Sequence, residues 1–532
     1  MSTPATLEPG ATAGDGDADG APAPVDEVTN QIRGSSLLVF GRILSLAANL
    51  VIQVLLVRSL SKTDYGIFAY ALSIVTMIAT LCTLGLDRGL ARFIAMYDEE
   101  GKKPKVWGTL VLQLISIIGI GLAATALVVV AHGWIGDNLV HDDRLGVLLA
   151  VMVILAPLQA LDNMAATIFA AFGRSKAIFL RRYIVAPLLR LGIVLMLLAT
   201  DGNLYVLGTG YVLAGVFGLV VYGKLMMQTL RQRGLLDRVD GGRIGIDMPI
   251  REVTAFTLPL LMSDAMFVVL NTSDVVILGH SAGAAAVASY RSVLPLARLN
   301  QVVMNSFSLL FAPLMARLWA RGDRRALKEA YWQTAAWVTV LTFPIFAVTL
   351  GLAQPVTVAL FGSRYADAAA YLRILSIAYY FNAVLGFNGV TVKMIGRVWL
   401  SAGTAGVALV FNLAINLILI PMYGPMGAAC GTAASIVFYN LLKQWALREG
   451  SGLQLFDPRY LRLYLTIIAG TVGLLLLDLS GAAVVVRVVL VAAIVAIVLL
   501  VGRKVLMMGE MFPELNRIPL VGRLIGSGTV SQ

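Results

Sequence analysis

The chain has 532 residues, of which 58% are hydrophobic and only 13% are charged, and its net charge is +11. Soluble domains carry about 25% charged residues, so this composition excludes a large soluble domain and indicates an integral membrane protein. An excess of Lys and Arg is typical of the cytoplasmic loops of such proteins, so the charge does not indicate a nucleic-acid partner. The two cysteines lie in apolar segments, which predicts no disulfide framework, and the three histidines predict no metal site within the membrane.

The first 32 residues are rich in Ala, Gly, Pro and Asp and are expected to form a disordered cytoplasmic tail. After this tail, windows of about 20 apolar residues predict membrane-spanning helices. A basic, amphipathic cytoplasmic tail is expected over residues 503–532. Fourteen helices are predicted in between, which gives an all-α fold: 34–57, 65–86, 107–131, 145–171, 178–199, 203–225, 253–278, 284–314, 331–353, 367–390, 399–420, 426–446, 460–478 and 482–502.

The basic residues set the orientation of these helices. An even number of helices places both termini on one side of the membrane. If that side is the inside, the expected outer turns hold only four of the 41 Lys and Arg, namely Arg58, Lys62, Arg144 and Arg364. Because cytoplasmic loops are enriched in Lys and Arg, this asymmetry predicts that both termini are cytoplasmic.

A repeat divides the chain into two lobes. The longest inner connection, residues 226–252, separates a six-helix lobe at 33–225 from a second one at 253–448, and residues 449–502 hold two further helices. A constant shift places Val57 on Ile277 and Tyr70 on Tyr290, and six helices lie between equivalent points. Both copies therefore have the same orientation, which predicts a parallel repeat about an axis along the membrane normal, as in several transporters.

The sequence shows no motif for nucleotide hydrolysis or metal-dependent catalysis. It contains no G-x-x-x-x-G-K-[ST] segment and no H-E-x-x-H segment. The expected outer turns are short, whereas a membrane glycosyltransferase or polymerase would need a larger outer loop to shape its site. We therefore predict a transporter and not an enzyme, without a cofactor, driven by an ion gradient or by the gradient of its substrate.

Polar residues inside membrane helices are costly and therefore mark candidate sites. In the helix at 34–57, Arg42, Asn49 and Gln53 are spaced by seven and four residues and share one face. Equivalent helices of a parallel repeat can face each other across a cavity, and arginines suit a phosphate or a diphosphate; Arg42 alternatively snorkels to the membrane interface. We predict that six residues bind the substrate in a central cavity: Arg42, Asn49, Gln53, Arg291, Arg298 and Arg373.

Acidic residues in or beside the helices are candidates for ion coupling or gating. Asp264 and Asp274 share one face of the helix at 253–278, and Asp87 and Arg88 stand at the inner end of the helix at 65–86. Each pair has a structural alternative, because the two aspartates could pair with arginines and Asp87 and Arg88 could form a static contact. The predicted coupling or gating set is Asp264, Asp274, Asp87 and Arg88, and the choice between proton and sodium stays open.

Several segments resemble a known family. They are a first helix that begins at Gly34 and carries Arg42, the turn LSKTDYGIF at Leu60–Phe68, and GLDRGLARFIA at Gly85–Ala95. The second half contains a similar G-x-x-x-V-A-x-Y segment at Gly283–Tyr290. Together they resemble the Wzx-type polysaccharide flippases of the multidrug/oligosaccharidyl-lipid/polysaccharide exporter superfamily.

The resemblance implies a function and partners. It implies that undecaprenyl-diphosphate-linked oligosaccharide is flipped from the cytoplasmic to the outer leaflet of a bacterial inner membrane, by alternating access of the two lobes, for surface polysaccharide biosynthesis. The implied partners are this lipid-linked oligosaccharide, membrane lipids, and polysaccharide polymerase or export proteins. Three alternatives stay open: lipid II as the cargo, a cation-coupled multidrug antiporter of the same superfamily, and a membrane glycosyltransferase or polymerase.

Overall fold

The computed structural model describes residues 24–83, 85–140, 142–200, 202–232, 235, 246–451, 453, 456–479 and 481–506. Every element in these ranges is a helix, as the sequence predicts. The predicted N-terminal and C-terminal tails lie largely outside the described residues. The first helix begins at Pro24, well before the predicted start at Gly34.

The first lobe holds the helices that precede the connection at residues 233–249. In chain order they are α1 (Pro24–Ser59), α2 (Lys62–Thr83), α3 (Leu86–Glu99), α4 (Lys103–Val130), α5 (His132–Ile135), the π-helix η1 (Gly136–Val140), α6 (Asp143–Met152), α7 (Leu155–Ala171), α8 (Ser175–Ile178), the π-helix η2 (Phe179–Val185), α9 (Ala186–Ala199) and α10 (Leu204–Gln232).

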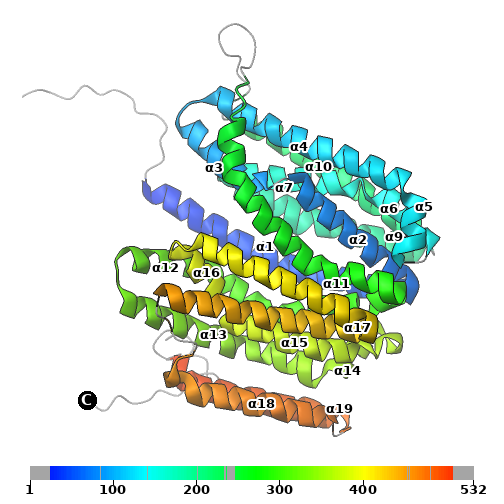
Figure 1. Cartoon of the computed structure of the whole chain (residues 1–532), viewed down its shortest axis with the longest axis vertical. Helices are drawn as coiled ribbons and strands as arrows, with labels where there is room; N and C mark the ends of the chain where they lie inside the picture. Colours follow the sequence, from blue (N-terminus) through cyan, green and yellow to red (C-terminus); the bar gives the residue numbers. More distant parts are fainter. Residues whose placement is uncertain are drawn as a thin grey trace, which may run out of the picture.

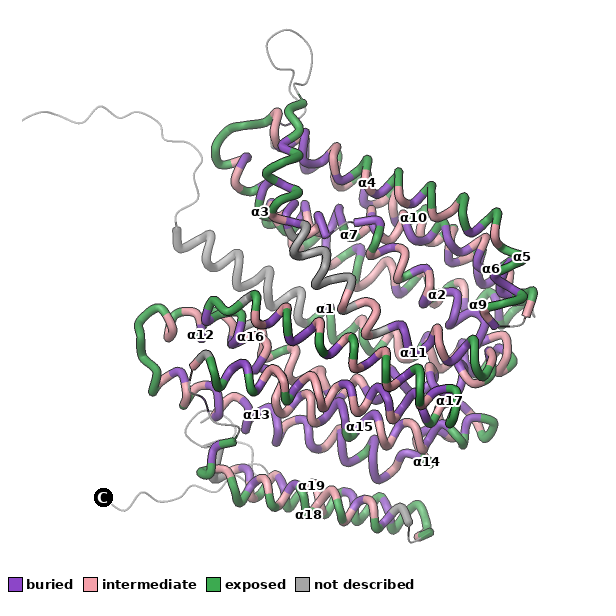
Figure 2. The backbone as a smooth tube through the Cα atoms, viewed as in Figure 1, coloured by how far each residue is buried: buried purple, intermediate pink, exposed green. Residues whose placement is uncertain are grey.

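The second lobe follows and carries two more helices on its outer side. Its elements are α11 (Ile250–Arg298), η3 (Leu299–Gln301), α12 (Val302–Ala320), α13 (Arg324–Gly351), α14 (Ala353–Phe361), η4 (Ser363–Tyr365), α15 (Ala368–Leu385), α16 (Phe387–Met394) and α17 (Val398–Ser451). After η5 (Pro458–Tyr460), the helices α18 (Leu461–Leu479) and α19 (Val484–Leu506) pack on α13 (Figure 1). Figure 2 shows long buried stretches in α13 and α15, in the interior of this lobe.

Two of the longest helices fold back on themselves at a glycine. Gly283 in α11 has φ 77° and ψ 178°, and Gly424 in α17 has φ 56° and ψ −131°. L-residues with a side chain rarely adopt such a positive φ, whereas glycine does so at little cost. The arms of each hairpin touch: Tyr290 donates to Asp274 across the α11 turn at 2.5 Å, and Asn412 donates to Ser435 across the α17 turn at 3.0 Å. Each hairpin therefore accounts for two of the fourteen predicted spans.

The helices have the length and composition of membrane spans. Within the described residues, eleven helices are long and apolar enough to cross a membrane, or twelve if the bent pair 272–308 and 311–320 is one span. The 51-residue segment Trp399–Glu449 in α17 is counted once in this number although it turns at Gly424. Each predicted span overlaps a helical segment, so the predicted all-α membrane fold is confirmed.

One helix was not predicted. The stretch after residue 86 was expected to be an inner connection, but the structure has α3 there, entered through Gly85 at φ 67°. Leu90, Phe93, Ile94 and Tyr97 are buried on one face of this helix. Their spacing is that of an amphipathic helix, and the segment is too charged and too short to register as a membrane span.

The two lobes contact each other at both ends of the molecule. We call one of them the α1–α2 end, after the turn between those helices, and the opposite end, where α3 lies, the α3 end. At the α1–α2 end, α2 packs on α11 so closely that a Cβ atom at Gly66 would lie 1.9 Å from the carbonyl oxygen of Ala284. At the α3 end, α11 begins beside α3 of the first lobe (Figure 1). There Tyr97 donates to Glu252 at 2.7 Å.

Candidate functional site

A cavity of about 650 Å³ lies inside the first lobe and is closed on one side by the second arm of α11. Its wall comes from α1, α2, α7, η2, α9, α10, α11 and, through Leu299, the start of η3. The lining is strongly cationic, because it includes Arg181, Arg182, Arg190, Arg291 and Arg298. Asp162 is the single acidic residue among the described lining residues. This imbalance of charge favours an anionic occupant.

Four of the six residues predicted to bind substrate line this cavity. They are Asn49 and Gln53 on α1, and Arg291 and Arg298 on the second arm of α11. The other two are not among the lining residues. Arg42 is exposed on α1, one turn before Ser45, which does line the cavity, and Arg373 is half-buried in α15 of the second lobe.

The α1 wall presents amide groups to the cavity. Gln53 donates to the hydroxyl of Tyr65 on α2 at 2.5 Å. Asn49 donates to the carbonyl oxygen of Ser45 at 2.7 Å and accepts a long hydrogen bond of 3.5 Å from Arg190 on α9. These contacts fix the side chains on one face of α1. It is the face that carries both Asn49 and Gln53, as their spacing of four residues predicts.

The two arginines of α11 connect the cavity to both lobes. Arg291 donates from Nη2 to the hydroxyl of Ser73 on α2, and Asp274 lies within its electrostatic reach. Arg298 donates from Nε to the hydroxyl of Tyr379 on α15 at 3.2 Å. Arg291 thus ties α11 to the first lobe, and Arg298 ties it to the second.

Sequence reasoning missed the charged group on the far wall of the cavity. Arg181 and Arg182 were counted only as inner basic residues that set the orientation, Arg190 was placed within a helix without a role, and Asp162 was not considered. A signal was present in the sequence, because Gln159, Asp162 and Asn163 interrupt an otherwise apolar span. All three line the cavity, and such polar groups inside a membrane helix usually face a cavity or another helix.

Arg181 is the most enclosed of these cations. It is only 6% exposed, and its Nη2 lies 2.8 Å from Oδ1 of Asp162 on α7. Its guanidinium group stacks over the ring of Tyr222 on α10, 5.4 Å from the ring centre. Gly218, one turn earlier on α10, makes this position possible, because a Cβ atom there would lie 2.0 Å from Arg181 Nη2.

Of the four predicted coupling or gating residues, the two whose side chains the structure describes are not among the cavity-lining residues. Asp274 is 3% exposed within the second lobe, where it accepts from Tyr290 at 2.5 Å, from Thr432 at 3.3 Å and from the backbone amide of Val275 at 2.8 Å. Asp87 lies at the start of α3 and accepts from Gln113 on α4. The side chains of Asp264 and Arg88 lie outside the described residues.

A set of polar contacts joins the lobes at the α1–α2 end, and we call Arg58, Lys62, Arg364 and Asp367 the latch. Lys62 lies 3.1 Å from the carboxylate of Asp367. Arg58 donates to the carbonyl oxygen of Leu360 at 2.8 Å, and Arg364 donates back to that of Arg58 at 3.0 Å. Because Arg58 and Lys62 belong to the first lobe and the other two to the second, the latch holds the lobes together at this end.

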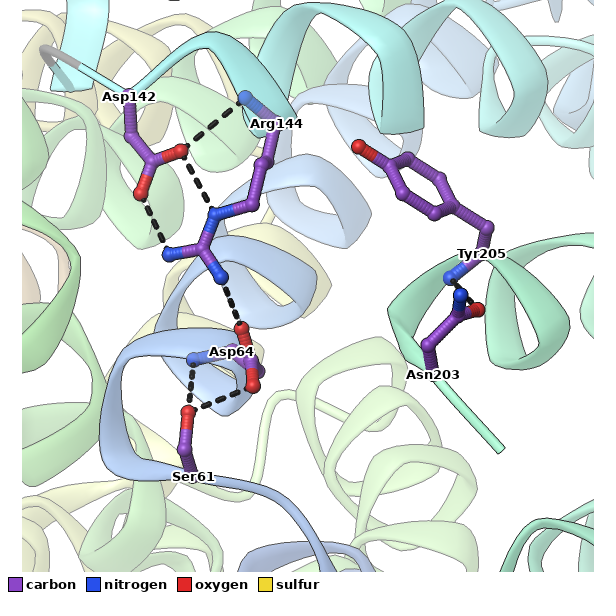
Figure 3. A network of polar contacts seen from close by, with 6 residues as sticks. All are labelled: Ser61, Asp64, Asp142, Arg144, Asn203 and Tyr205. Atoms are coloured by element: carbon purple, nitrogen blue, oxygen red, sulfur yellow. Dashed lines mark hydrogen bonds and ion pairs between the residues drawn. The ribbon is translucent and has the colours of Figure 1, made fainter. Parts of the chain in front are cut away.

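A second network braces the latch from within the first lobe. Arg144 lies between Asp142 and Asp64, with distances of 2.8 Å and 2.7 Å, and Ser61 donates to Asp64 at 2.6 Å (Figure 3). The hydrogen-bonded Arg144 guanidinium holds the pKa of Asp142 below its usual range. The α1–α2 turn is therefore fixed to the start of α6 while Lys62 reaches across to the second lobe.

We expect Asp367→Asn to loosen the latch, because it removes the partner of Lys62 and weakens the 2.7 Å bond from Ser289. Both interactions are partly exposed, and each is worth on the order of 1 kcal/mol. A cysteine at Ala284, in a background without Cys82 and Cys430, should then react with a maleimide about threefold faster. Glu329→Gln, which breaks an exposed pair with Arg325 on α13, is the control. Equal labelling rates in both variants would contradict a latch.

The fold and the cavity together define a class of protein. An all-helical membrane protein with two lobes and a charged cavity at the membrane-spanning helices is built as a transporter or flippase. The family model described as "Polysaccharide biosynthesis protein" matches residues 32–319, and the chain belongs to this family and, with it, to the multidrug/oligosaccharidyl-lipid/polysaccharide exporter superfamily. A second model, described as MatE, matches residues 259–418.

Individual relatives and structures agree with this assignment. The chain is 24% identical to the succinoglycan biosynthesis transport protein ExoT of Rhizobium meliloti over 61% of each chain. It is 22% identical to an uncharacterized membrane protein of Methanocaldococcus jannaschii, over 84% of this chain and 88% of the relative. The fold is similar to the lipid II flippase MurJ in an inward closed conformation, with a TM-score of 0.65, 13% identity, and coverage of 91% and 99%. An inward-facing MATE family multidrug resistance transporter has a TM-score of 0.63, 16% identity, and coverage of 77% and 95%.

Proposed function

We propose that the protein flips undecaprenyl-diphosphate-linked oligosaccharide from the cytoplasmic to the outer leaflet of a bacterial inner membrane, for surface polysaccharide biosynthesis. The observation that carries the proposal is the cavity with five arginines and one aspartate. A guanidinium group can donate two parallel hydrogen bonds to a phosphate group, and it stays charged at any physiological pH. Several such groups around one cavity suit a diphosphate, and the relative ExoT is named as a transport protein of polysaccharide biosynthesis.

The proposal includes an orientation. We place both termini and the α3 end in the cytoplasm, because the predicted inner connections hold most of the Lys and Arg. The α1–α2 end then faces outwards, and the latch closes the molecule on that side. In this arrangement the cavity takes up a head group from the cytoplasmic leaflet, and release to the outer leaflet requires the latch to open. Polysaccharide polymerase or export proteins would receive the cargo there.

We further propose that Asp274 couples an ion to this cycle. It is a buried carboxylate in contact with both arms of α11 and with α17, so a change in its charge would alter the packing of that hairpin. It also lies within electrostatic reach of Arg291, which links it to the cavity. Asp87, Arg88 and Asp264 stay predictions for gating or coupling, and Arg42 and Arg373 stay predictions for substrate contact at another step of transport.

The main alternative is a cation-coupled multidrug antiporter of the same superfamily, which the MatE match over residues 259–418 favours. An antiporter for cationic drugs needs an acidic cavity, however, and here arginines outnumber the single aspartate. Lipid II is a second alternative, because it also carries a diphosphate and would suit the same arginines.

Reconstituted protein distinguishes these functions. Proteoliposomes would be loaded in parallel with undecaprenyl-diphosphate-linked oligosaccharide, with lipid II, or with a cationic dye under a proton or sodium gradient. We expect translocation of the lipid-linked oligosaccharide, read out by a lectin that reaches only the outer leaflet. Gradient-driven movement of the dye without lipid translocation would overturn the proposal, and transport of lipid II alone would change the cargo.

A further inference from the structure

The single carboxylate among the described residues of the cavity wall lies directly beside the most enclosed cation. Asp162 and Arg181 form an ion pair at 2.8 Å, with side chains that are 26% and 7% exposed. The charges of Arg181, Arg182 and Arg190 all act on Asp162. A negative group in this position is not needed to attract an anion, and it repels one. Its presence among five arginines therefore calls for a role other than binding.

The guanidinium group of Arg181 is held at the cavity wall, where it can pair either with the Asp162 carboxylate or with a phosphate of the cargo. Tyr222 and Gly218 form the floor under its guanidinium group, so the group cannot retreat from the cavity. A carboxylate and a phosphate accept hydrogen bonds from the same edge of a guanidinium group. While Asp162 is paired with Nη2, a phosphate has to compete for that group.

We propose that Asp162 is a resident anion that occupies Arg181 in the empty cavity and is displaced by the diphosphate of the cargo. When the cargo leaves, Asp162 takes back Arg181, so that release is favoured and the cavity does not hold its cargo permanently. Asp162 is thus a positioning residue that sets the affinity of the cavity. The inference rests on the proposed function, because it assumes that the cavity binds a diphosphate.

The affinity of the whole protein in detergent for farnesyl diphosphate, measured by isothermal titration calorimetry, tests this role. We expect Asp162→Asn to bind the probe about tenfold more tightly than the wild type, because the competing charge is lost while the shape is kept. In proteoliposomes the same variant should show a lower KM and a lower kcat for the lipid-linked oligosaccharide, since release becomes slow. Glu329→Gln removes an equal charge from an exposed site and should leave the affinity unchanged.

A second comparison covers the case in which Asp162→Asn does not fold because Arg181 is left unpaired. The variant Asp162→Asn/Arg181→Gln removes both members of the ion pair and is compared with Arg181→Gln alone. We expect the double variant to bind farnesyl diphosphate about threefold more tightly, since only the repulsion by Asp162 is then removed. Equal affinities in this comparison would show that Asp162 does not oppose the anion.

The outcomes separate this inference from the proposed function. If the wild type binds farnesyl diphosphate and Arg291→Gln weakens binding, but Asp162→Asn binds no more tightly than the wild type, then the resident-anion role is wrong and the proposed function stands. If neither the wild type nor any arginine variant binds the probe, both the proposed function and the inference fall.

Discussion

Arg291→Gln should lower the initial rate of lipid-linked oligosaccharide translocation in proteoliposomes by about 100-fold, which corresponds to roughly 2.7 kcal/mol. Arg291 is the cation that the structure places between the two lobes, because it lines the cavity from α11 and donates to Ser73 on α2. Glutamine keeps a hydrogen-bond donor for Ser73 but removes the charge. The loss therefore reports on the cation and not on the hydrogen bond.

The buried carboxylate of Asp274 is a second reason to expect a large effect of Arg291→Gln. Asp274 is 3% exposed and lies within electrostatic reach of Arg291, so removing the arginine leaves a buried carboxylate with less compensating charge. We therefore expect Arg291→Gln to unfold at a lower temperature as well, and Arg291→Gln/Asp274→Asn to recover part of that stability without recovering transport. Arg325→Gln, at an exposed site on α13, is the control for loss of a positive charge. A folded Arg291→Gln protein that translocates at the wild-type rate would contradict the role of the cavity.

The membrane-spanning helices could be predicted from the sequence because the hydropathy of a span is a property of consecutive residues. A membrane span is an uninterrupted apolar window, and the two hairpins turn at Gly283 and Gly424, where glycine separates such windows. The helix α3 was missed for the same reason. Its buried side is a stripe that includes Leu90, Phe93 and Tyr97, and a stripe does not raise the mean hydropathy of a window.

The site is harder to predict because it depends on which helices face one another. The repeat suggested a cavity between equivalent helices of the two lobes, but the cavity is lined almost wholly by the first lobe, and only one arm of α11 closes it. This packing leaves Arg373 outside the lining. It also brings in Arg181 and Arg182, which belong to the π-helix η2 near the α3 end. In the sequence they stand at the inner end of a predicted span, where basic residues are expected for orientation alone.

A transporter that opens to one side at a time needs contacts that close the other side, and the latch residues lie where such contacts are needed. The contacts between lobes at the α1–α2 end include a close backbone approach, at Gly66 and Ala284, as well as the ionic contacts of Lys62 and Asp367. The ionic contacts are exposed and individually weak. The close approach of backbones is steric, so it depends on the absence of a side chain and is more sensitive to mutation.

Gly66→Ala should therefore separate the lobes at the α1–α2 end. The new Cβ atom would lie 1.9 Å from the carbonyl oxygen and 2.5 Å from the carbonyl carbon of Ala284. Both are backbone atoms, which cannot rotate away as a flexible side chain can, so α11 itself has to move. Overpacking of this kind costs about 1–3 kcal/mol. The cost applies only while the lobes are closed at this end, so the variant should favour the state that is open there.

Two measurements check this expectation against a matched control. Gly119→Ala places the same methyl group on α4, where no atom lies within 4 Å, and it should keep or slightly raise the melting temperature. Gly66→Ala should melt earlier, and a cysteine at Ala284 in that variant should react with a maleimide at least about fivefold faster. If both glycine variants melt alike and label alike, then α2 and α11 do not form the closed contact of the transport cycle. If Gly66→Ala labels faster yet translocates normally, closure at this end does not limit transport.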